Sequence, residues 1–260
     1  MQLQLRDIHM SFTNAQKETF DLLRGVNLDI QEGKITALVG GNGTGKTTLF
    51  NIISGFEKNY TGDVLFEGKN FNNIPSHRIS LMGIGRLFQD GQLLPGLTLM
   101  ENLKMASDNK IGEMPFSSLL WRKKSQNAEA TKEQQAKDVL TRIFGGDNKY
   151  LNMLNQDASA FSYGEQRLLS LARLLMGNDC LLLLDEPTSG VNPTYIDTIE
   201  KIIKEMVADG LTILLIEHNM HFVRNIADIC AYLDDGVIAK VGPTAEVLDD
   251  KNVRNSYLGL

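Results

Sequence analysis

Residues 40–47 read Gly-Gly-Asn-Gly-Thr-Gly-Lys-Thr, which matches the complete Gly-x-x-x-x-Gly-Lys-Thr pattern of a phosphate-binding loop. An apolar run stands immediately before the loop at residues 35–39, and residues 48–53 after it have the pattern of a helix. A strand that leads into such a loop and a helix that leaves it place backbone N–H groups and the positive helix N-terminus around a polyphosphate. The order of the segments therefore predicts an α/β fold with a nucleoside triphosphate site.

The loop residues have separate expected roles. Glycines let the backbone approach the phosphates, Lys46 neutralises charge at the β and γ positions, and the Thr47 hydroxyl can ligate Mg²⁺. A chance glycine turn is the alternative, and the strand and helix on either side argue against it. The candidate nucleotide-binding residues of this segment are Gly40, Gly41, Asn42, Gly43, Thr44, Gly45, Lys46, Thr47 and Thr48.

Two carboxylates follow a second apolar run, at residues 181–184. Ligand sites of parallel sheets lie at the carboxyl ends of strands, so Asp185 is expected to hold Mg²⁺ and Glu186 to polarise a water as general base. The alternative is that the two carboxylates cap a helix. The predicted site thus combines a phosphate loop with a metal-binding strand end.

Residues 161–166 read Phe-Ser-Tyr-Gly-Glu-Gln and precede a helical pattern at residues 167–176, with the helix expected to begin near Gln166. This segment resembles the Leu-Ser-Gly-Gly-Gln signature of ATP-binding-cassette (ABC) ATPases. Further resemblances lie at Gln89 for the glutamine loop, at residues 189–192 for the loop after the metal strand, and at His218 for the switch histidine. The elements occur in the family's order over nearly the whole chain.

The resemblance implies ATP and Mg²⁺ as cofactors and assigns roles to particular residues. Glu186, His218 and Gln89 would be catalytic, Thr47, Gln89 and Asp185 would surround Mg²⁺, and Phe12 would stack on adenine, with Phe20 as its competitor. The signature would act on the ATP of a second cassette in a homodimer or heterodimer. Its candidate residues are Ser162, Tyr163, Gly164, Glu165 and Gln166.

The expected architecture is a P-loop NTPase core with a mixed, largely parallel sheet, an N-terminal antiparallel β subdomain and an inserted α-helical subdomain. Residues 1–89 and 177–260 would form the nucleotide-binding core, and residues 90–176 would form the helical subdomain of a single 1–260 ATPase domain. Within the insertion, helices are expected at residues 101–106 and 127–143.

The composition limits the partners. The 260 residues carry a formal charge of −6, which argues against an extended nucleic-acid-binding surface. The sequence has no run near the ~20 apolar residues that a membrane-spanning helix needs. In a transporter the pore would therefore belong to separate integral membrane permease subunits, with this chain peripheral at the cytoplasmic face of the plasma (inner) membrane. The apolar loop at residues 90–98 is the expected contact with the permease.

Several details resemble the ATPase subunits of branched-chain amino-acid and amide importers, which also use an extracytoplasmic solute-binding protein. They are Tyr163 in the signature, Asn192 followed by Pro193, and residues 216–220, 241–243 and 257–259. The chain departs from this branch at Gly41, where proline is usual, and at residues 161–162. A lipopolysaccharide-type export ATPase and a soluble cassette ATPase that acts in assembly or DNA repair remain alternatives.

Overall fold

The computed structural model describes residues 1–13, 18–89, 93–107, 122–145 and 148–258. It divides into two compact units, each of which is described by itself. The first contains residues 1–89, 179–189 and 200–260, and the second contains residues 90–178 and 190–199. The core predicted from the sequence, residues 1–89 and 177–260, differs from the first unit at residues 177–178 and 190–199, which belong to the second unit.

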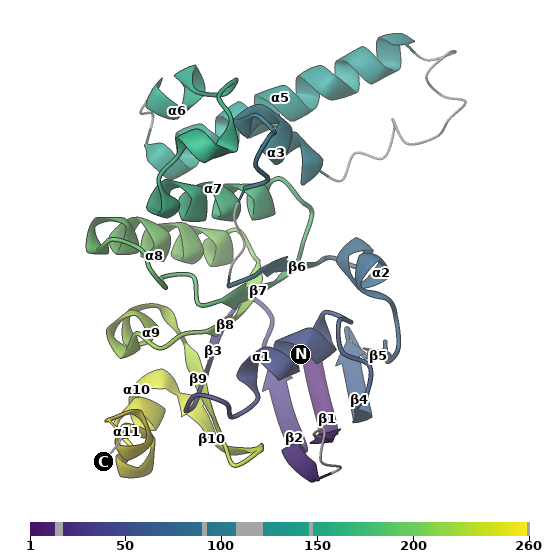
Figure 1. Cartoon of the computed structure of the whole chain (residues 1–260), viewed down its shortest axis with the longest axis vertical. Coiled ribbons are helices and arrows are strands. Elements are labelled where there is room, and N and C mark those ends of the chain that lie inside the picture. Colours follow the sequence, from purple (N-terminus) through teal and green to yellow (C-terminus); the bar gives the residue numbers. More distant parts are fainter. Residues whose placement is uncertain (14–17, 90–92, 108–121, 146–147, 259–260) are drawn as a thin grey trace. The chain divides into compact units, whose positions relative to one another are not determined.

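A six-stranded sheet in the order β10-β9-β3-β8-β7-β6 is the centre of the first unit (Figure 1). β3 runs parallel to β8 and β9, β7 runs parallel to β6 and β8, and β10 alone of these pairs is antiparallel, to β9. Every residue of β3, β7 and β8 is buried, as expected for central parallel strands. The strands are β3 (Ile35–Val39), β6 (Ile84–Leu87), β7 (Leu181–Asp185), β8 (Thr212–Ile216), β9 (Ile229–Asp234) and β10 (Val237–Pro243).

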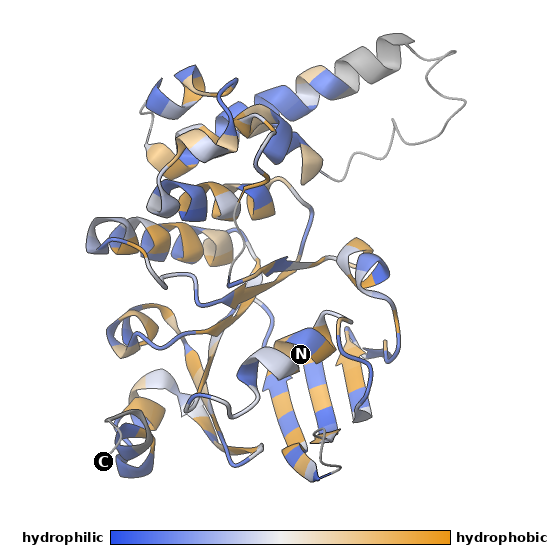
Figure 2. Cartoon of the chain, viewed as in Figure 1, coloured by the Kyte–Doolittle hydropathy of each residue, from blue (hydrophilic) through white to orange (hydrophobic). Residues whose placement is uncertain are grey.

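The antiparallel sheet of the same unit has the order β2-β1-β4-β5. Hydrophobic and hydrophilic residues alternate along β1, β2 and β4 in Figure 2, which is the pattern of strands with one buried face. Its strands are β1 (Leu3–Thr13), β2 (Thr19–Ile30), β4 (Thr61–Phe66) and β5 (Lys69–Asn70). This sheet is the predicted N-terminal antiparallel element.

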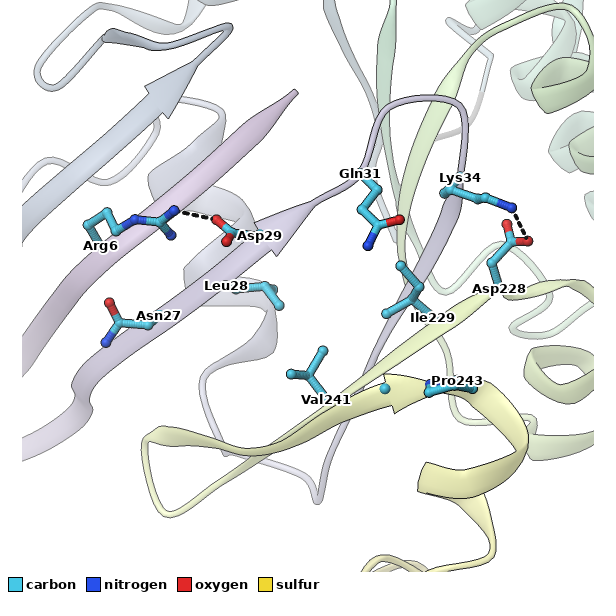
Figure 3. A pocket seen from close by; sticks show the side chains of 11 residues that line it. Arg6, Asn27, Leu28, Asp29, Gln31, Lys34, Asp228, Ile229, Val241 and Pro243 are labelled. Atoms are coloured by element: carbon cyan, nitrogen blue, oxygen red, sulfur yellow. Dashed lines mark hydrogen bonds and ion pairs between the residues drawn. The ribbon is translucent and has the colours of Figure 1, made fainter. Parts of the chain in front are cut away.

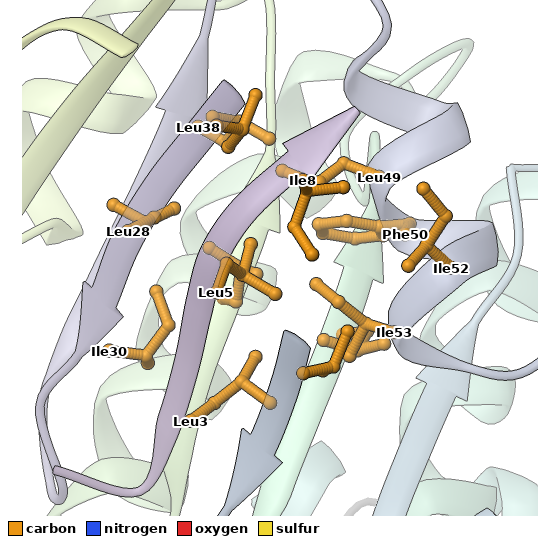
Figure 4. Close-up of a cluster of buried hydrophobic side chains, with 14 of the residues drawn as sticks. Leu3, Leu5, Ile8, Leu28, Ile30, Leu38, Leu49, Phe50, Ile52 and Ile53 are labelled. Atoms are coloured by element: carbon orange, nitrogen blue, oxygen red, sulfur yellow. The ribbon is translucent and has the colours of Figure 1, made fainter. Parts of the chain in front are cut away.

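The main core of the first unit forms where α1 packs against strands of both sheets. Leu49, Phe50 and Ile53 of α1 lie against Leu5 and Ile8 of β1 (Figure 4), and all five are fully buried. Burial of such side chains contributes about 1.5–3 kcal/mol each. The helices of this unit are α1 (Lys46–Ile53), α2 (Ser76–Leu81), α9 (Met220–Ile226), α10 (Thr244–Leu248) and α11 (Lys251–Leu258).

The second unit is helical in its described residues, as the sequence predicted for the insertion. α5 packs on α3 and α7, and its Leu140 is buried together with Leu103 of α3 and Leu171 of α7. The helices are α3 (Leu99–Met105), α5 (Arg122–Phe144), α6 (Asn148–Asn152), the 3₁₀ turn η2 (Ala158–Ala160) and α7 (Tyr163–Leu175), and α8 (Pro193–Ala208) begins in this unit.

Two helices begin earlier than predicted. The helix after the phosphate loop starts at Lys46 and not at Thr48, because Gly45 is its N-cap residue. The signature helix starts at Tyr163 and not near Gln166, because Ser162 and Glu165 form a capping box. Both differences arise from capping, which hydrophobic periodicity does not report.

Candidate nucleotide-binding site

The phosphate loop joins the carboxyl end of β3 to the amino end of α1. Gly45 has φ of 101°, a left-handed conformation that glycine adopts without strain. A Cβ on Gly40 would collide with the backbone carbonyl oxygen of Leu233. These two positions therefore require glycine, and glycines at such positions let a loop backbone approach a ligand at the start of a helix.

Lys46 is buried, with 6% of its surface exposed, and its side chain turns back over the loop. Its Nζ donates hydrogen bonds to the carbonyl oxygens of Gly40 at 2.8 Å and Gly41 at 2.7 Å. Burial lowers the pKa of Lys46, and the carboxylates of Glu186 and Asp185 oppose that shift. The ammonium group and these carboxylates are thus electrostatically coupled across the end of the sheet.

Four neighbouring strand ends bring the remaining candidates to one edge of the sheet. β6, β7, β8 and β3 are adjacent and parallel, so their carboxyl ends lie together. Gln89 follows β6, Asp185 ends β7, His218 follows β8, and residues 40–47 follow β3. The topology therefore gathers side chains that lie as far apart in sequence as Lys46 and His218.

Glu186 lies between two of the predicted catalytic residues. Gln89 Nε2 donates a hydrogen bond to its Oε2 at 2.8 Å, and His218 Nε2 lies 2.9 Å from its Oε1. The Glu186 backbone has φ of 48°, a left-handed conformation uncommon for residues other than glycine, and its N–H donates to the carbonyl oxygen of Ile216 at 2.9 Å. This turn aims the Glu186 carboxylate at the glutamine and the histidine.

Asp185 is 1% exposed and contacts a buried cation. Arg86 on β6 donates to its Oδ2 at 3.3 Å, and also to Asn51 at 2.8 Å and Ser54 at 2.6 Å at the end of α1. Burial lowers the pKa of Arg86, and the contact with Asp185 opposes the shift. The arginine thereby ties the predicted metal-binding strand to the helix of the phosphate loop.

The chemistry of the donor set fits Mg²⁺. A hydroxyl at Thr47, a carboxylate at Asp185 and an amide oxygen at Gln89 are hard oxygen ligands, and Mg²⁺ is usually bound by one or two carboxylates together with substrate phosphates. Among the described residues there is no group of three or more His, Cys, Asp or Glu side chains able to hold a metal by themselves. The donor set agrees with a site completed by substrate phosphates.

The two candidate adenine-stacking residues are cross-strand partners. Phe12 on β1 pairs with Phe20 on β2, and their side chains are 48% and 57% exposed. Large exposed aromatic rings of this kind are available to stack on a flat ligand. The structure thus places both rings on the same strand pair and leaves the choice between them open. Of the loop residues, Asn42, Gly43 and Thr47 are exposed, and Thr44 and Thr48 are half-buried.

The signature segment begins α7 in the second unit. Ser162 is the N-cap residue and accepts a long hydrogen bond from the Glu165 N–H at 3.4 Å, while Glu165 Oε2 accepts from the Ser162 N–H at 2.9 Å and hydroxyl at 2.8 Å. Gln166 Nε2 donates to the carbonyl oxygen of Phe161 at 2.9 Å. Tyr163 is 41% exposed, and Gly164 is buried where a Cβ would press on the ring of Tyr195.

Glu165 also accepts hydrogen bonds from two side chains outside the segment, Lys149 at 2.5 Å and Tyr150 at 3.0 Å. Burial raises the pKa of Glu165, but these hydrogen bonds and those from Ser162 outweigh it and lower the pKa from 4.5 to about 2. The carboxylate therefore stays charged in the folded chain under acidic conditions and holds the helix start in place.

Glu165→Gln is expected to reduce the acid sensitivity of the chain. Because the folded pKa is depressed, Glu165 stabilises the fold fully above about pH 4.5, and this contribution is lost as pH falls toward about 2. Glutamine keeps an acceptor for the capping box without the charge. Urea unfolding should show the stability difference between wild type and Glu165→Gln shrinking from pH 5 to pH 2.5. A difference that does not vary with pH would contradict the assignment, and Glu246→Gln, an exposed carboxylate, serves as control.

A cavity of about 610 Å³ lies at the opposite, amino-terminal end of β3 (Figure 3). Its charged side chains form two ion pairs, Arg6 with Asp29 at 2.6 Å and Lys34 with Asp228 at 3.1 Å. Leu28, Ile229, Val241 and Pro243 are among its other lining residues. None of the predicted site residues lines this cavity.

Sequence reasoning assigned no role to Arg86, whose side chain is 6% exposed, or to the buried residues Thr188 and Glu217. A signal for two of them was present, because Arg86 interrupts the apolar strand β6 and Glu217 ends the apolar run of β8. Charged residues at such positions are seldom buried without a partner.

No helix in the described part of the chain is long and apolar enough to cross a bilayer.

Comparison with known proteins agrees with this geometry. The family model described as ABC transporter matches residues 23–189, more than half of the 260-residue chain. The high-affinity branched-chain amino acid transport ATP-binding proteins BraF of Pseudomonas aeruginosa and LivG of Escherichia coli are 30% and 33% identical over 238 residues, covering 91% of this chain and 91% of each relative.

Solved structures give the same result. A nucleotide-free ATP-binding cassette from an ABC transporter superimposes with a TM-score of 0.80 at 31% identity, covering 100% of this chain and 99% of that one. A cassette in its ADP conformation has a TM-score of 0.79 at 30% identity, with the same coverage. The predicted family and fold are therefore confirmed: the chain belongs to the ABC transporter family, as one of its ATP-binding cassette ATPases.

Proposed function

We propose that the chain hydrolyses ATP to energise uptake of branched-chain amino acids or related small polar solutes through separate membrane subunits. The observation that carries this proposal is the 30–33% identity, over 91% of the chain, to ATP-binding subunits of branched-chain amino-acid transport. The meeting of Gln89, Glu186 and His218 beside the phosphate loop supplies a chemical basis for hydrolysis.

In this proposal the loop and its lysine bind the polyphosphate. The N–H groups of residues 40–47 and the start of α1 face the phosphates, and Lys46 exchanges its hydrogen bonds to Gly40 and Gly41 for the terminal phosphates. Thr47, Asp185 and Gln89 would hold Mg²⁺, which supplies charge neutralisation at the β and γ phosphates. Phe12 or Phe20 would stack on the adenine ring.

Glu186 would accept a proton from the attacking water as general base. The hydrogen bond from Gln89 and the contact with His218 hold its carboxylate in place before the substrate binds. The side chain of His218 would donate a hydrogen bond to the γ-phosphate. Its contact with Glu186 keeps the imidazole and the carboxylate close together. Ser162, Tyr163, Gly164, Glu165 and Gln166 of a second cassette would close over the γ-phosphate at the start of α7.

The proposed partners are a second cassette, identical or related, integral membrane permeases and an extracytoplasmic solute-binding protein, with this chain at the cytoplasmic face of the plasma membrane. The loop at residues 90–98 is the proposed permease contact. Residues 90–92 lie outside the described part; of the next two, Leu93 is buried and Leu94 is 39% exposed. An exposed leucine five residues after Gln89 in the sequence suits the transfer of motion from the ATP site to a partner.

The transport proposal is tested in the organism that encodes the chain. Replacing the native copy by the Glu186→Gln variant should abolish uptake of labelled branched-chain amino acids while an unrelated uptake system works normally. Normal uptake of leucine, isoleucine and valine by cells that contain only the variant would contradict the importer proposal. If these cells instead lost uptake of a different solute, the chain would be assigned to an importer of that solute.

Ser162→Arg separates the nucleotide pocket from the signature. The monomer should bind MgATP with nearly wild-type affinity yet show no hydrolysis, because the arginine would stand against the partner's nucleotide. Ser162→Ala removes the capping oxygen without the bulk and should keep partial activity. Titration calorimetry and phosphate release measure the two properties.

A mixing experiment controls for misfolding of Ser162→Arg. Combined with Lys46→Ala, it should form heterodimers in which one composite site has an intact loop and an intact signature. At equal amounts half of the dimers are mixed, so activity should rise from near zero toward about a quarter of the wild-type value. Heterodimers that form without any recovery, or full activity of Ser162→Arg alone, would overturn the composite site.

A further inference from the structure

Glu217 is a buried carboxylate to which the mechanism above gives no role. It directly follows β8, precedes His218, and is 3% exposed. A buried carboxylate is costly unless its oxygens accept hydrogen bonds. The partners of Glu217 therefore indicate what it does.

The two oxygens of Glu217 accept from two different turns. Oε1 accepts from the backbone N–H of Thr188 at 2.9 Å and from its hydroxyl at 2.5 Å. Oε2 accepts from the backbone N–H of His218 at 2.8 Å and of Asn219 at 3.0 Å. Charge-assisted hydrogen bonds of this kind are about twice as strong as neutral ones. One carboxylate thus joins the turn after β7 to the turn after β8.

Each of these turns carries one member of the Glu186–His218 contact. Thr188 lies two residues after Glu186, whose backbone is already in the left-handed region, and His218 is adjacent to Glu217 itself. The distance of 2.9 Å between His218 Nε2 and Glu186 Oε1 depends on both turns being held at a fixed separation. Asn219 continues the arrangement, because its side chain caps α9.

We propose that Glu217, with Thr188, is a positioning residue that clamps the two turns and so sets the placement of Glu186 against His218. The proposal rests on the proposed hydrolysis of ATP by this site. The hydrogen bonds of Glu217 go to Thr188, His218 and Asn219, beside the proposed catalytic residues and not to the phosphate loop. Loss of the clamp should therefore affect the chemical step far more than ATP binding.

Thr188 offers the cleanest test because its variants are nearly isosteric. Thr188→Val removes the hydroxyl and should lower kcat by about 10- to 10²-fold, since small misplacements of reacting groups have effects of that size. KM for ATP should change by less than about twofold, the pattern of an interaction used in the transition state. Thr188→Ser keeps the hydroxyl and should restore most of kcat. Glu217→Gln, which cannot accept from all four donors, should resemble Thr188→Val.

Thr36→Val is the matched control. Thr36 is a fully buried residue of β3 whose hydroxyl has no hydrogen-bond partner within the described structure. It tests the same chemical change in the same unit, outside the clamp, and should leave kcat and KM unchanged. A similar fall in kcat for Thr36→Val would show that any buried Thr→Val change disturbs this unit, and would overturn the specific role of Thr188.

Two further measurements separate positioning from general stability. In a His218→Ala background, Thr188→Val should cause little additional loss, because both changes disrupt the same contact, whereas a merely structural defect would be additive. Amide hydrogen exchange should show loss of protection at His218 and Asn219 in the Glu217→Gln variant. The loss should be smaller in the Thr188→Ser variant.

The outcomes distinguish this inference from the proposed function. A wild-type chain that hydrolyses ATP, together with Thr188→Val and Glu217→Gln variants of wild-type kcat, would overturn the clamp and leave the ATPase proposal standing. A wild-type chain without hydrolysis would overturn the proposed function. The exchange comparison then decides the clamp by itself, because unchanged protection at His218 and Asn219 in Glu217→Gln would contradict it.

Discussion

Replacing Glu186 by glutamine should stop ATP hydrolysis while leaving ATP binding intact. Removing a positioned general base typically lowers a rate by about 10² to 10⁴-fold. Glutamine keeps one oxygen for the hydrogen bond from Gln89, so the site should keep its shape. It cannot take the proton of the attacking water. Phosphate release under single-turnover conditions measures the loss directly.

The same variant should trap the closed dimer. If each bound ATP is gripped by two cassettes, blocking hydrolysis prevents reopening, so ATP should shift Glu186→Gln from monomer to dimer and ADP should not. Light scattering coupled to gel filtration resolves the two states. Glu246→Gln removes an exposed carboxylate of α10 and should behave as wild type.

Two results would contradict this reasoning in different ways. Normal hydrolysis by Glu186→Gln would remove the general-base role of Glu186. A variant that does not hydrolyse ATP but stays monomeric, at ATP concentrations well above its dissociation constant, would keep that role and remove the ATP-bridged dimer.

The fold could be predicted because its central buried strands correspond to short, largely apolar runs in the sequence. Residues 35–39 are apolar apart from Thr36 and residues 181–184 are all leucine, and they form central strands β3 and β7 with every residue buried. The helical nature of the insertion followed from periodicity at residues 127–143, although α5 extends from Arg122 to Phe144. Apolar patterning reports burial and repeats, and these decide the class of fold.

The helix starts could not be taken from apolar patterning, because capping sets them. Gly45 supplies a left-handed N-cap, and Ser162 with Glu165 forms a capping box. The capping box at Ser162 and Glu165 could have been recognised in the sequence, since Ser-x-x-Glu is itself a helix-start motif. It was interpreted only as part of the ABC signature, and the helix was therefore placed three residues too late.

The sequence predicted which strand ends carry candidate residues, and not how the side chains meet. The contact of Glu186 with Gln89 and His218 depends on the left-handed backbone of Glu186 and on the turn held by Glu217. Neither has a sequence pattern of its own. Adenine stacking illustrates the same limit, because Phe12 and Phe20 are opposite one another on β1 and β2 and both are exposed.

Lys46→Ala should weaken MgATP binding and abolish hydrolysis together. Lys46 lies at the start of α1 and places its ammonium group over the phosphate loop, on the carbonyl oxygens of Gly40 and Gly41. Hydrogen bonds to charged groups contribute about 1.5–3 kcal/mol, so losing this cation should weaken binding by about 10- to 10²-fold. Titration calorimetry with MgATP measures the affinity, and phosphate release measures the rate.

Lys34→Ala is the control for the loss of one positive charge. Lys34 lies at the other end of β3, in an exposed ion pair with Asp228, where a surface salt bridge contributes about 0–1 kcal/mol. Its removal changes the net charge by the same amount as Lys46→Ala and should leave MgATP affinity unaltered. The reason is that charges at that end act on the nucleotide only through a screened field. Equal affinities of Lys46→Ala and wild type would mean that the loop does not bind the terminal phosphates. Equal weakening by both variants would mean that net charge, and not the position of Lys46, controls binding.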